Sequence, residues 1–288
     1  MGSPVASEAV RDLLEGYSAE VTTPDRRSLD TAAKMMPANA PVYVASLPRD
    51  TPESQLDVAR MLKELGLQPV PHIVARNIPD RRSFEKIIYD LSRYAGVDRA
   101  LILGGDRDRP VGDYHSSLQL LKSGILEDHG IKRVAVGCYP EGHPAIADDI
   151  LETALFEKID TASRGGIDLR LITQLCFDAD AICGYLAALR SKGVTSKIRV
   201  GIAGPAKTPT LLKYAAICGV GPSLKALKKQ RKITRGLLKT QTPATLLRNI
   251  AEQNRRNALL DITGVHFFTF ASLSGTIDWA EKQLGRGS

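Results

Sequence analysis

Val136-Gly137-Cys138-Tyr139-Pro140-Glu141-Gly142-His143-Pro144 is the stretch of sequence that decides the fold. An apolar run ends at Tyr139, a turn with proline and glycine follows, and a helix-forming segment begins after Pro144. Polar side chains therefore lie where a buried strand gives way to a helix. In α/β proteins, ligands bind at this edge of the sheet. An ordinary strand-to-helix turn has the same pattern, so the rest of the chain must show whether this turn binds a ligand.

The alternation of apolar run and helical segment repeats along the chain. Strands are expected over residues 17–22, 41–47, 70–75, 99–103, 133–138, 169–175, 198–203 and 265–270. Helices are expected over 26–36, 51–65, 80–95, 113–127, 145–163, 179–192, 208–218, 222–238, 242–259 and 273–284. These assignments follow from apolar spacing and from capping residues. Continuous apolar strands are typical of a parallel sheet that is covered on both faces.

This pattern predicts an α/β fold, a single-domain (β/α)8 TIM barrel over residues 17–288, preceded by an N-terminal helix or arm over 1–16. Eight regular units without a linker fit one closed barrel. The alternative is a doubly wound open sheet, which would carry a glycine-rich loop after its first strand. The segment 17–24 has no such loop.

Composition is ordinary for a soluble globular protein, with 288 residues of which 43% are hydrophobic and 25% charged. No apolar run is long enough to span a bilayer, and the first residues lack the blocks of a signal peptide, so we expect a cytoplasmic protein without membrane contact. The cysteines lack metal-site spacing and are expected to be reduced core residues. They are Cys138, Cys176, Cys183 and Cys218.

Much of the net charge of +7 lies between Lys225 and Lys239. Such a run can bind phosphates or nucleic acid. Here it has no interleaved aromatic residues, and several leucines in it need burial. We therefore interpret it as the solvated face of a helix and expect no nucleic-acid partner.

Polar residues follow most of the expected strands at their carboxyl ends, where barrels carry their chemistry. The set is Glu20, Ser46, His72, Asp106, Tyr139, His143, Gln174 and the turn 201–205. It contains no metal-type pair of carboxylates and histidines, no strand-end lysine for a Schiff base and no serine in a nucleophile elbow. The set favours the positioning of a cofactor together with one acid, and no metal site is expected.

Glu20 stands between apolar neighbours, which would raise its pKa and suit a general acid. The glycines of Gly104-Gly105-Asp106 allow a ligand to approach the backbone closely. His72 lies inside an apolar run, where a hydrogen-bonded core histidine is the more common interpretation. Gln174 ends a buried strand, where its amide needs partners that a heteroaromatic ring would supply.

At these residues the chain resembles the methylenetetrahydrofolate reductase family, roughly from Glu20 to Phe270. The most specific pieces are Tyr-Pro-Glu-Gly-His-Pro at 139–144 and Ile-Thr-Gln-Leu-Cys-Phe-Asp at 172–178. Supporting pieces are Pro71-His72, Gly105-Asp106, Lys158-Ile159-Asp160 and residues 265–269.

The resemblance implies an FAD cofactor across the top of the barrel. The positions that match its contacts are His72, Gly104, Gly105, Asp106, Tyr139, His143, Lys158 and Glu152, with Asp149 as the alternative to Glu152. Lys158 would face the diphosphate. Gln174 would contact the folate pterin and the nicotinamide, and Asp106 would serve both flavin and folate. Glu20 would be the acid that protonates the N10 side of the folate.

The implied activity is the interconversion of 5,10-methylenetetrahydrofolate and 5-methyltetrahydrofolate in one-carbon metabolism and methionine biosynthesis. NADH or NADPH would reduce the flavin and leave, and the folate would then receive the hydride. The expected partners are the folate and the nicotinamide dinucleotide, and a homo-oligomer is compatible with the sequence.

Several residues depart from the family pattern. Ala19-Glu20-Val21-Thr22 keeps the acid without its usual aromatic neighbours, and Gly104 stands where an arginine is usual. An arginine is also missing after Phe270. One alternative is therefore a folate-dependent methyltransferase or demethylase component that holds no flavin. Another is a degenerate barrel that acts as a binding partner.

Overall fold

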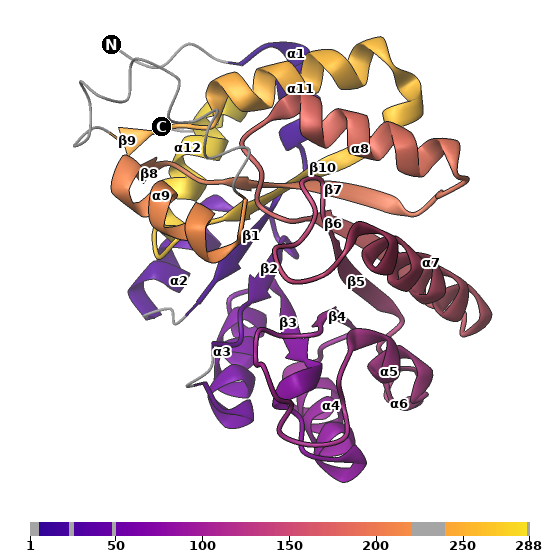
Figure 1. The fold of residues 1–288 in the computed structure, drawn as a ribbon. Coiled ribbons are helices and arrows are strands. Elements are labelled where there is room, and N and C mark those ends of the chain that lie inside the picture. Colours follow the sequence, from indigo (N-terminus) through magenta and orange to yellow (C-terminus); the bar gives the residue numbers. More distant parts are fainter. Residues whose placement is uncertain (1–5, 23–25, 48–49, 221–239, 287–288) are drawn as a thin grey trace.

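The computed structural model describes residues 6–22, 26–47, 50–220 and 240–286 of the chain. Eight parallel strands close into one barrel in the order β1-β10-β7-β6-β5-β4-β3-β2 (Figure 1). The (β/α)8 barrel predicted from the sequence is confirmed. The strands are β1 (Ser18–Val21), β2 (Pro41–Val44), β3 (Gln68–Val74), β4 (Arg99–Leu103), β5 (Arg133–Cys138), β6 (Asp168–Thr173), β7 (Lys197–Ala203) and β10 (Ile262–Phe268).

Helices surround the barrel (Figure 1). They are α1 (Glu8–Leu14), α2 (Arg26–Met35), α3 (Pro52–Glu64), α4 (Arg81–Ala95), α5 (Ser117–Lys122), α6 (Ile125–Asp128), α7 (Asp148–Arg164), α8 (Ala179–Ser191), α9 (Thr208–Ile217), α11 (Ala244–Arg256) and α12 (Leu273–Leu284). The short 3-10 helices are η1 (Ala75–Asn77) and η2 (Ala258–Leu260). No helix among the described residues has both the length and the apolar character to cross a membrane.

Two local expectations differ from the structure. The single helix expected over 113–127 is two helices, because Gly124 adopts a left-handed φ of 77° and interrupts the hydrogen bonding between α5 and α6. A short antiparallel pair, β8 (Ala206–Lys207) with β9 (Thr240–Gln241), was not expected from the sequence. The helix expected over 222–238 and the basic run 225–239 lie outside the described residues.

Helix boundaries follow from local capping. At the start of α3, the Thr51 hydroxyl accepts a hydrogen bond from the Ser54 amide, and the Ser54 hydroxyl accepts one from the Thr51 amide. This reciprocal pair satisfies two amides that the helix leaves unpaired. Helix α4 begins at Asp80, whose carboxylate accepts from the Ser83 amide, and it ends at Gly96 in the left-handed conformation.

Alternation along the strands divides the buried side chains into an outer and an inner set. The outer set packs between sheet and helices and includes Phe84, Val136 and Phe267. The inner set forms an apolar layer across the middle of the barrel from Tyr43, Val70, Leu101, Ala135 and Ile172. Polar residues lie inside the barrel on both sides of this layer, towards the carboxyl and the amino ends of the strands.

We predict that Phe84→Ala lowers the free energy of unfolding by about 3–5 kcal/mol, because Phe84 is fully buried beneath α4 and its removal leaves a cavity. Urea titration followed by circular dichroism measures the change. Ile150→Ala on exposed α7 is the control and should shift the value by less than about 0.5 kcal/mol. An equal loss in both variants would contradict the assignment of this core.

Candidate active site

A carboxylate and two imidazoles meet inside the carboxyl end of the barrel. Glu20 Oε2 lies 3.5 Å from His72 Nε2 and 3.7 Å from His266 Nε2. Both Nε2 atoms are buried and have no further hydrogen-bond partner among the described residues. We call Glu20, His72 and His266 the acid cluster. Two imidazoles that face one carboxylate oxygen can hold a proton and exchange it with that oxygen.

Strand register brings these three residues together. They occupy inward positions on β1, β3 and β10, and β1 lies between β10 and β2 in the barrel. Ser18 is paired with His266 across the β1–β10 ladder, which places Glu20 one inward step above that pair. The Thr269 hydroxyl donates a 2.7 Å hydrogen bond to the Glu20 carbonyl oxygen and holds β1 at this level.

Further contacts fix the His266 ring. Its Nδ1 lies 3.0 Å from the Ser18 hydroxyl, which is also 3.4 Å from the Val265 carbonyl. The Tyr43 ring packs edge-on against it, with centroids 4.6 Å apart, and the Phe268 ring does so at 5.1 Å. The imidazole therefore cannot rotate away from Glu20, and a proton on it remains directed at the carboxylate.

The pKa of Glu20 differs from the sequence-based expectation. Burial pushes this pKa upward, as expected, but the hydrogen bond from His266 and the charges of His72 and His266 outweigh it, so the net shift is downward. The expectation of a raised pKa is therefore wrong, because the sequence pattern did not reveal that the His72 and His266 imidazoles face this carboxylate. Burial lowers the pKa of His72, and the Glu20 charge opposes that shift only in part.

Asp106 lies at the barrel mouth, in the segment that follows β4. Its carboxylate is exposed after β4. Burial, followed by the charges of Glu20 and then Asp106, raises the pKa of the Cys218 thiol to about 11. Both carboxylates therefore lie within electrostatic range of one thiol at the carboxyl end of the barrel.

The Tyr139–His143 turn lies at the same end. The two rings pack edge-on with centroids 5.5 Å apart. A Cβ at Gly137 would lie 3.5 Å from the Tyr139 hydroxyl, so the tyrosine folds back over the end of β5. His143 Nδ1 accepts a 3.2 Å hydrogen bond from the Ala145 amide. This bond shapes the turn and occupies one nitrogen of the ring.

The glycine pair after β4 has two different environments. Gly105 has a φ of 101°, and a Cβ there would lie 2.5 Å from Val74 Cγ1, so no larger residue fits. A Cβ at Gly104 would meet nothing within 4 Å. Gly104 therefore borders open space, while Gly105 shapes the turn that leads to Asp106.

The remaining predicted site residues differ in whether their side chains are already bonded to other protein groups. The Gln174 side chain accepts a 2.8 Å hydrogen bond from the Leu175 amide and so bends onto its own backbone. Lys158 on α7 is half-buried, burial lowers the pKa of its ammonium, and it forms no ion pair with a described residue. Glu152 on α7 instead pairs with Lys192, with 2.6 Å between Oε1 and Nζ.

An aromatic group that the sequence analysis did not single out covers part of the mouth. Phe270 stacks on Tyr214 with centroids 4.0 Å apart and lies parallel to Phe268. Phe270 and Ala271 have positive φ values of 48° and 64°, which is unusual for residues other than glycine. A Cβ at Gly201 would lie 2.7 Å from the Phe268 ring, so this glycine makes room for it. The run of phenylalanines at 267–270 was the available signal.

A family model described as methylenetetrahydrofolate reductase matches residues 16–273. The chain belongs to the methylenetetrahydrofolate reductase family. The match covers every strand of the barrel, including those that carry Glu20, His72 and His266. Membership in this family supports the interpretation that the chain is a folate-metabolising enzyme.

Some solved structures are similar to this methylenetetrahydrofolate reductase family member. One is described as an uncharacterized protein from Clostridium thermocellum that binds two copies of 5-methyl-5,6,7,8-tetrahydrofolic acid. It matches with a TM-score of 0.63 and 13% identity over 96% of this chain and 98% of that one. Another is a putative deoxyribose-phosphate aldolase from Toxoplasma gondii ME49, with a TM-score of 0.47 and 13% identity over 94% and 96%. The first of these structures, at 13% identity, supports the barrel fold of this chain.

We predict that His72→Gln flattens the pH dependence of stability between pH 7.5 and 5.5. The folded-state pKa of His72 is lowered, so the unfolded chain binds a proton below about pH 6.5 that the folded chain does not, and stability falls as pH falls. One such proton contributes at most about 1.4 kcal/mol per pH unit. Glu20, whose pKa is lowered, stays ionised over this range.

Urea titrations at several pH values measure this slope. His115→Gln at an exposed histidine is the matched control and should keep the wild-type slope. A His72→Gln protein with the full wild-type slope would show that His72 is not buried in its neutral form.

Proposed function

We propose that the chain is an FAD-dependent reductase that interconverts 5,10-methylenetetrahydrofolate and 5-methyltetrahydrofolate with NADH or NADPH. The observation that carries the proposal is the acid cluster at the barrel mouth, together with membership in the methylenetetrahydrofolate reductase family. The Clostridium thermocellum protein of the same fold binds 5-methyltetrahydrofolate, which supports a folate as substrate here.

Glu20 is the proposed proton donor. The hydrogen bond and charges that lower its pKa leave it ionised in the free protein, so the proposal requires Glu20 to take up a proton when a folate binds beside it. When a folate nitrogen approaches, Glu20 Oε2 transfers that proton to it, and His72 and His266 stabilise the carboxylate that remains. Burial of the two Nε2 atoms keeps water from competing for that proton.

Asp106 and Gln174 are proposed to orient the folate. Asp106 is exposed at the mouth and can accept hydrogen bonds from a pterin. Gln174 needs only to exchange its bond with the Leu175 amide for contacts with the ring. Because the ligand would be held by a few groups on strand ends, the main contribution of the protein is orientation.

The described residues fit FAD at its diphosphate. Lys158 supplies a half-buried ammonium without an ion-pair partner among them, which suits an anionic group. Gly105 lets the backbone approach a ligand, and the Tyr139 and His143 rings pack together in the turn after β5. When bound, FAD supplies the ring that carries hydride between nicotinamide and folate. NADH or NADPH would be the co-substrate.

A second candidate is a folate enzyme without flavin, such as a methyltransferase or demethylase component. This candidate is favoured because two residues expected to contact FAD are bonded to other protein groups. His72 faces Glu20 inside the barrel, and Glu152 is paired with Lys192. Gly104 also offers open space where an arginine is usual in the family.

The absorbance spectrum of the purified chain distinguishes these candidates. We expect flavin bands after incubation with FAD and gel filtration, and oxidation of NADH or NADPH that depends on methylenetetrahydrofolate. A colourless protein that binds tetrahydrofolate and turns over without added FAD would overturn the flavin proposal and support the second candidate.

We predict that Glu20→Gln keeps reduction of the flavin by NAD(P)H and loses at least about 100-fold in reduction of the folate, because a positioned acid typically contributes that much. Stopped-flow absorbance follows the two half-reactions separately. Glu64→Gln, at an exposed position of α3, is the matched control and should leave both unchanged. Equal losses in both half-reactions of Glu20→Gln would refute the acid role.

A further inference from the structure

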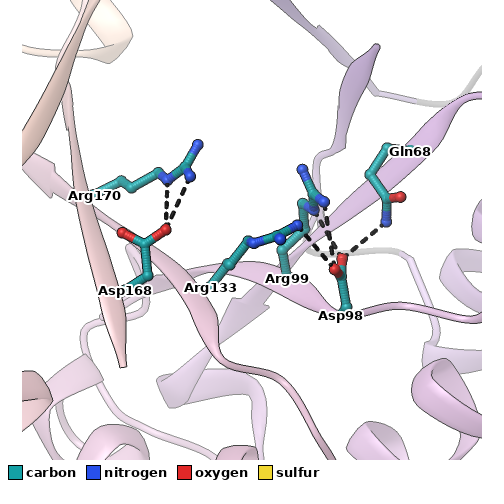
Figure 2. A network of polar contacts seen from close by, with 6 residues as sticks. All are labelled: Gln68, Asp98, Arg99, Arg133, Asp168 and Arg170. Atoms are coloured by element: carbon teal, nitrogen blue, oxygen red, sulfur yellow. Dashed lines mark hydrogen bonds and ion pairs between the residues drawn. The ribbon is translucent and has the colours of Figure 1, made fainter. Parts of the chain in front are cut away.

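Four arginines gather at the amino end of the barrel, on the opposite side of the apolar layer from the acid cluster. Arg99, Arg133, Arg170 and Arg199 come from four consecutive strands, β4 to β7. They line a cavity of about 30 Å³ together with Pro41, Tyr43 and Val70. Figure 2 shows three of them with their carboxylate partners. We call the four residues the arginine cluster.

Among the described residues, two carboxylates are bonded to these four guanidinium groups. Asp98 accepts hydrogen bonds from Arg99 Nε at 2.8 Å and Arg133 Nη1 at 3.1 Å. Asp168 accepts two from Arg170, from Nη2 at 2.9 Å and from Nε at 3.3 Å (Figure 2). Arg199 Nη1 bonds to backbone carbonyls, those of Gly16 at 2.8 Å and Val265 at 3.2 Å. Among these side chains, two positive charges are not neutralised.

Like charges are held close together in this cavity. Arg99 and Arg133 are direct partners in the β4–β5 register. Like charges directly opposite one another on neighbouring strands are destabilising. Burial and the charge of Arg170 both lower the pKa of Arg199. A bound anion would relieve this repulsion.

The Tyr43 side chain closes the inner side of the cavity. Burial raises its pKa, while Arg199, Arg170 and Arg99 act in the opposite direction, so all three cations lie near its ring. The hydroxyl stays protonated and can donate a hydrogen bond. Three guanidinium groups and one hydroxyl thus surround one small volume, while Arg133 and Arg170 remain 47% and 31% exposed and leave access from solvent.

We propose that the arginine cluster binds a small, multiply charged oxyanion of the phosphate class. Planar guanidinium groups bind phosphate oxygens through paired hydrogen bonds. The cavity has room for about two water-sized groups, which admits two oxygens of a tetrahedral anion and excludes a nucleoside, so the other oxygens would face the solvent-exposed opening. The anion is either free phosphate or the phosphate of a larger molecule whose remainder stays in solvent. The apolar layer separates the bound anion from the acid cluster. The anion would therefore stabilise the folded protein and take no part in the chemistry at the acid cluster.

Isothermal titration of the full chain with inorganic phosphate tests the proposal, with ionic strength held constant by sodium chloride. We expect one saturable site. Arg170→Gln should weaken binding about tenfold or more, because it removes a charge-assisted hydrogen-bond donor. Asp168→Asn should tighten binding, because it releases Arg170 from its carboxylate. If Arg170→Gln does not fold, Arg133→Gln serves in its place, since that side chain is more exposed.

Arg164→Gln is the matched control, because the Arg164 side chain is exposed on α7, pairs with Asp160 and does not line the cavity. It should bind phosphate like the wild type. A parallel titration with AMP identifies the source of the ligand, because tighter binding of AMP would point to an attached phosphate. No saturable binding of either anion up to about 10 mM, or an equal loss in Arg164→Gln, would overturn the proposal and leave the cluster with a structural role only.

Discussion

Closure of a parallel sheet into a barrel is the constraint on which the rest of this structure depends. Once the sheet closes, every second residue of a strand must share one narrow interior. Apolar residues around Tyr43 and Leu101 fill the middle of that space and exclude water. Charged groups are then confined to its two ends, where solvent or a ligand can reach them. The acid cluster and the arginine cluster are the two results of this confinement.

The acid cluster gains its properties from groups that are distant in sequence. Glu20 and His266 are separated by most of the chain and meet only because β1 pairs with β10. Their contact converts an isolated buried carboxyl group, which would resist ionisation, into one whose pKa is lowered by two neighbouring imidazoles. Under the proposed function, Glu20 therefore gains its proton as the folate binds.

Sequence patterns predicted the fold well because strands covered on both faces are continuous apolar runs. The runs at 99–103, 133–138 and 198–203 are strands in the structure, with ends that agree within a residue or two. They also placed Glu20 and His72 at strand ends. They failed where the outcome depended on tertiary contacts. The pKa of Glu20 was expected to rise, because nothing local to it indicates His266. The arginine cluster was not recognised, because its members are dispersed over four strands.

The pairing of β1 with β10 also has a consequence for how the chain reaches its native state. The first strand obtains one of its two neighbours only when Ile262–Phe268 has been made, so a growing chain carries two open sheet edges until late in synthesis. Contacts so far apart in sequence slow folding, and exposed edges favour association with other chains. Pairing of β10 with both β1 and β7 thus closes the barrel and removes both open edges.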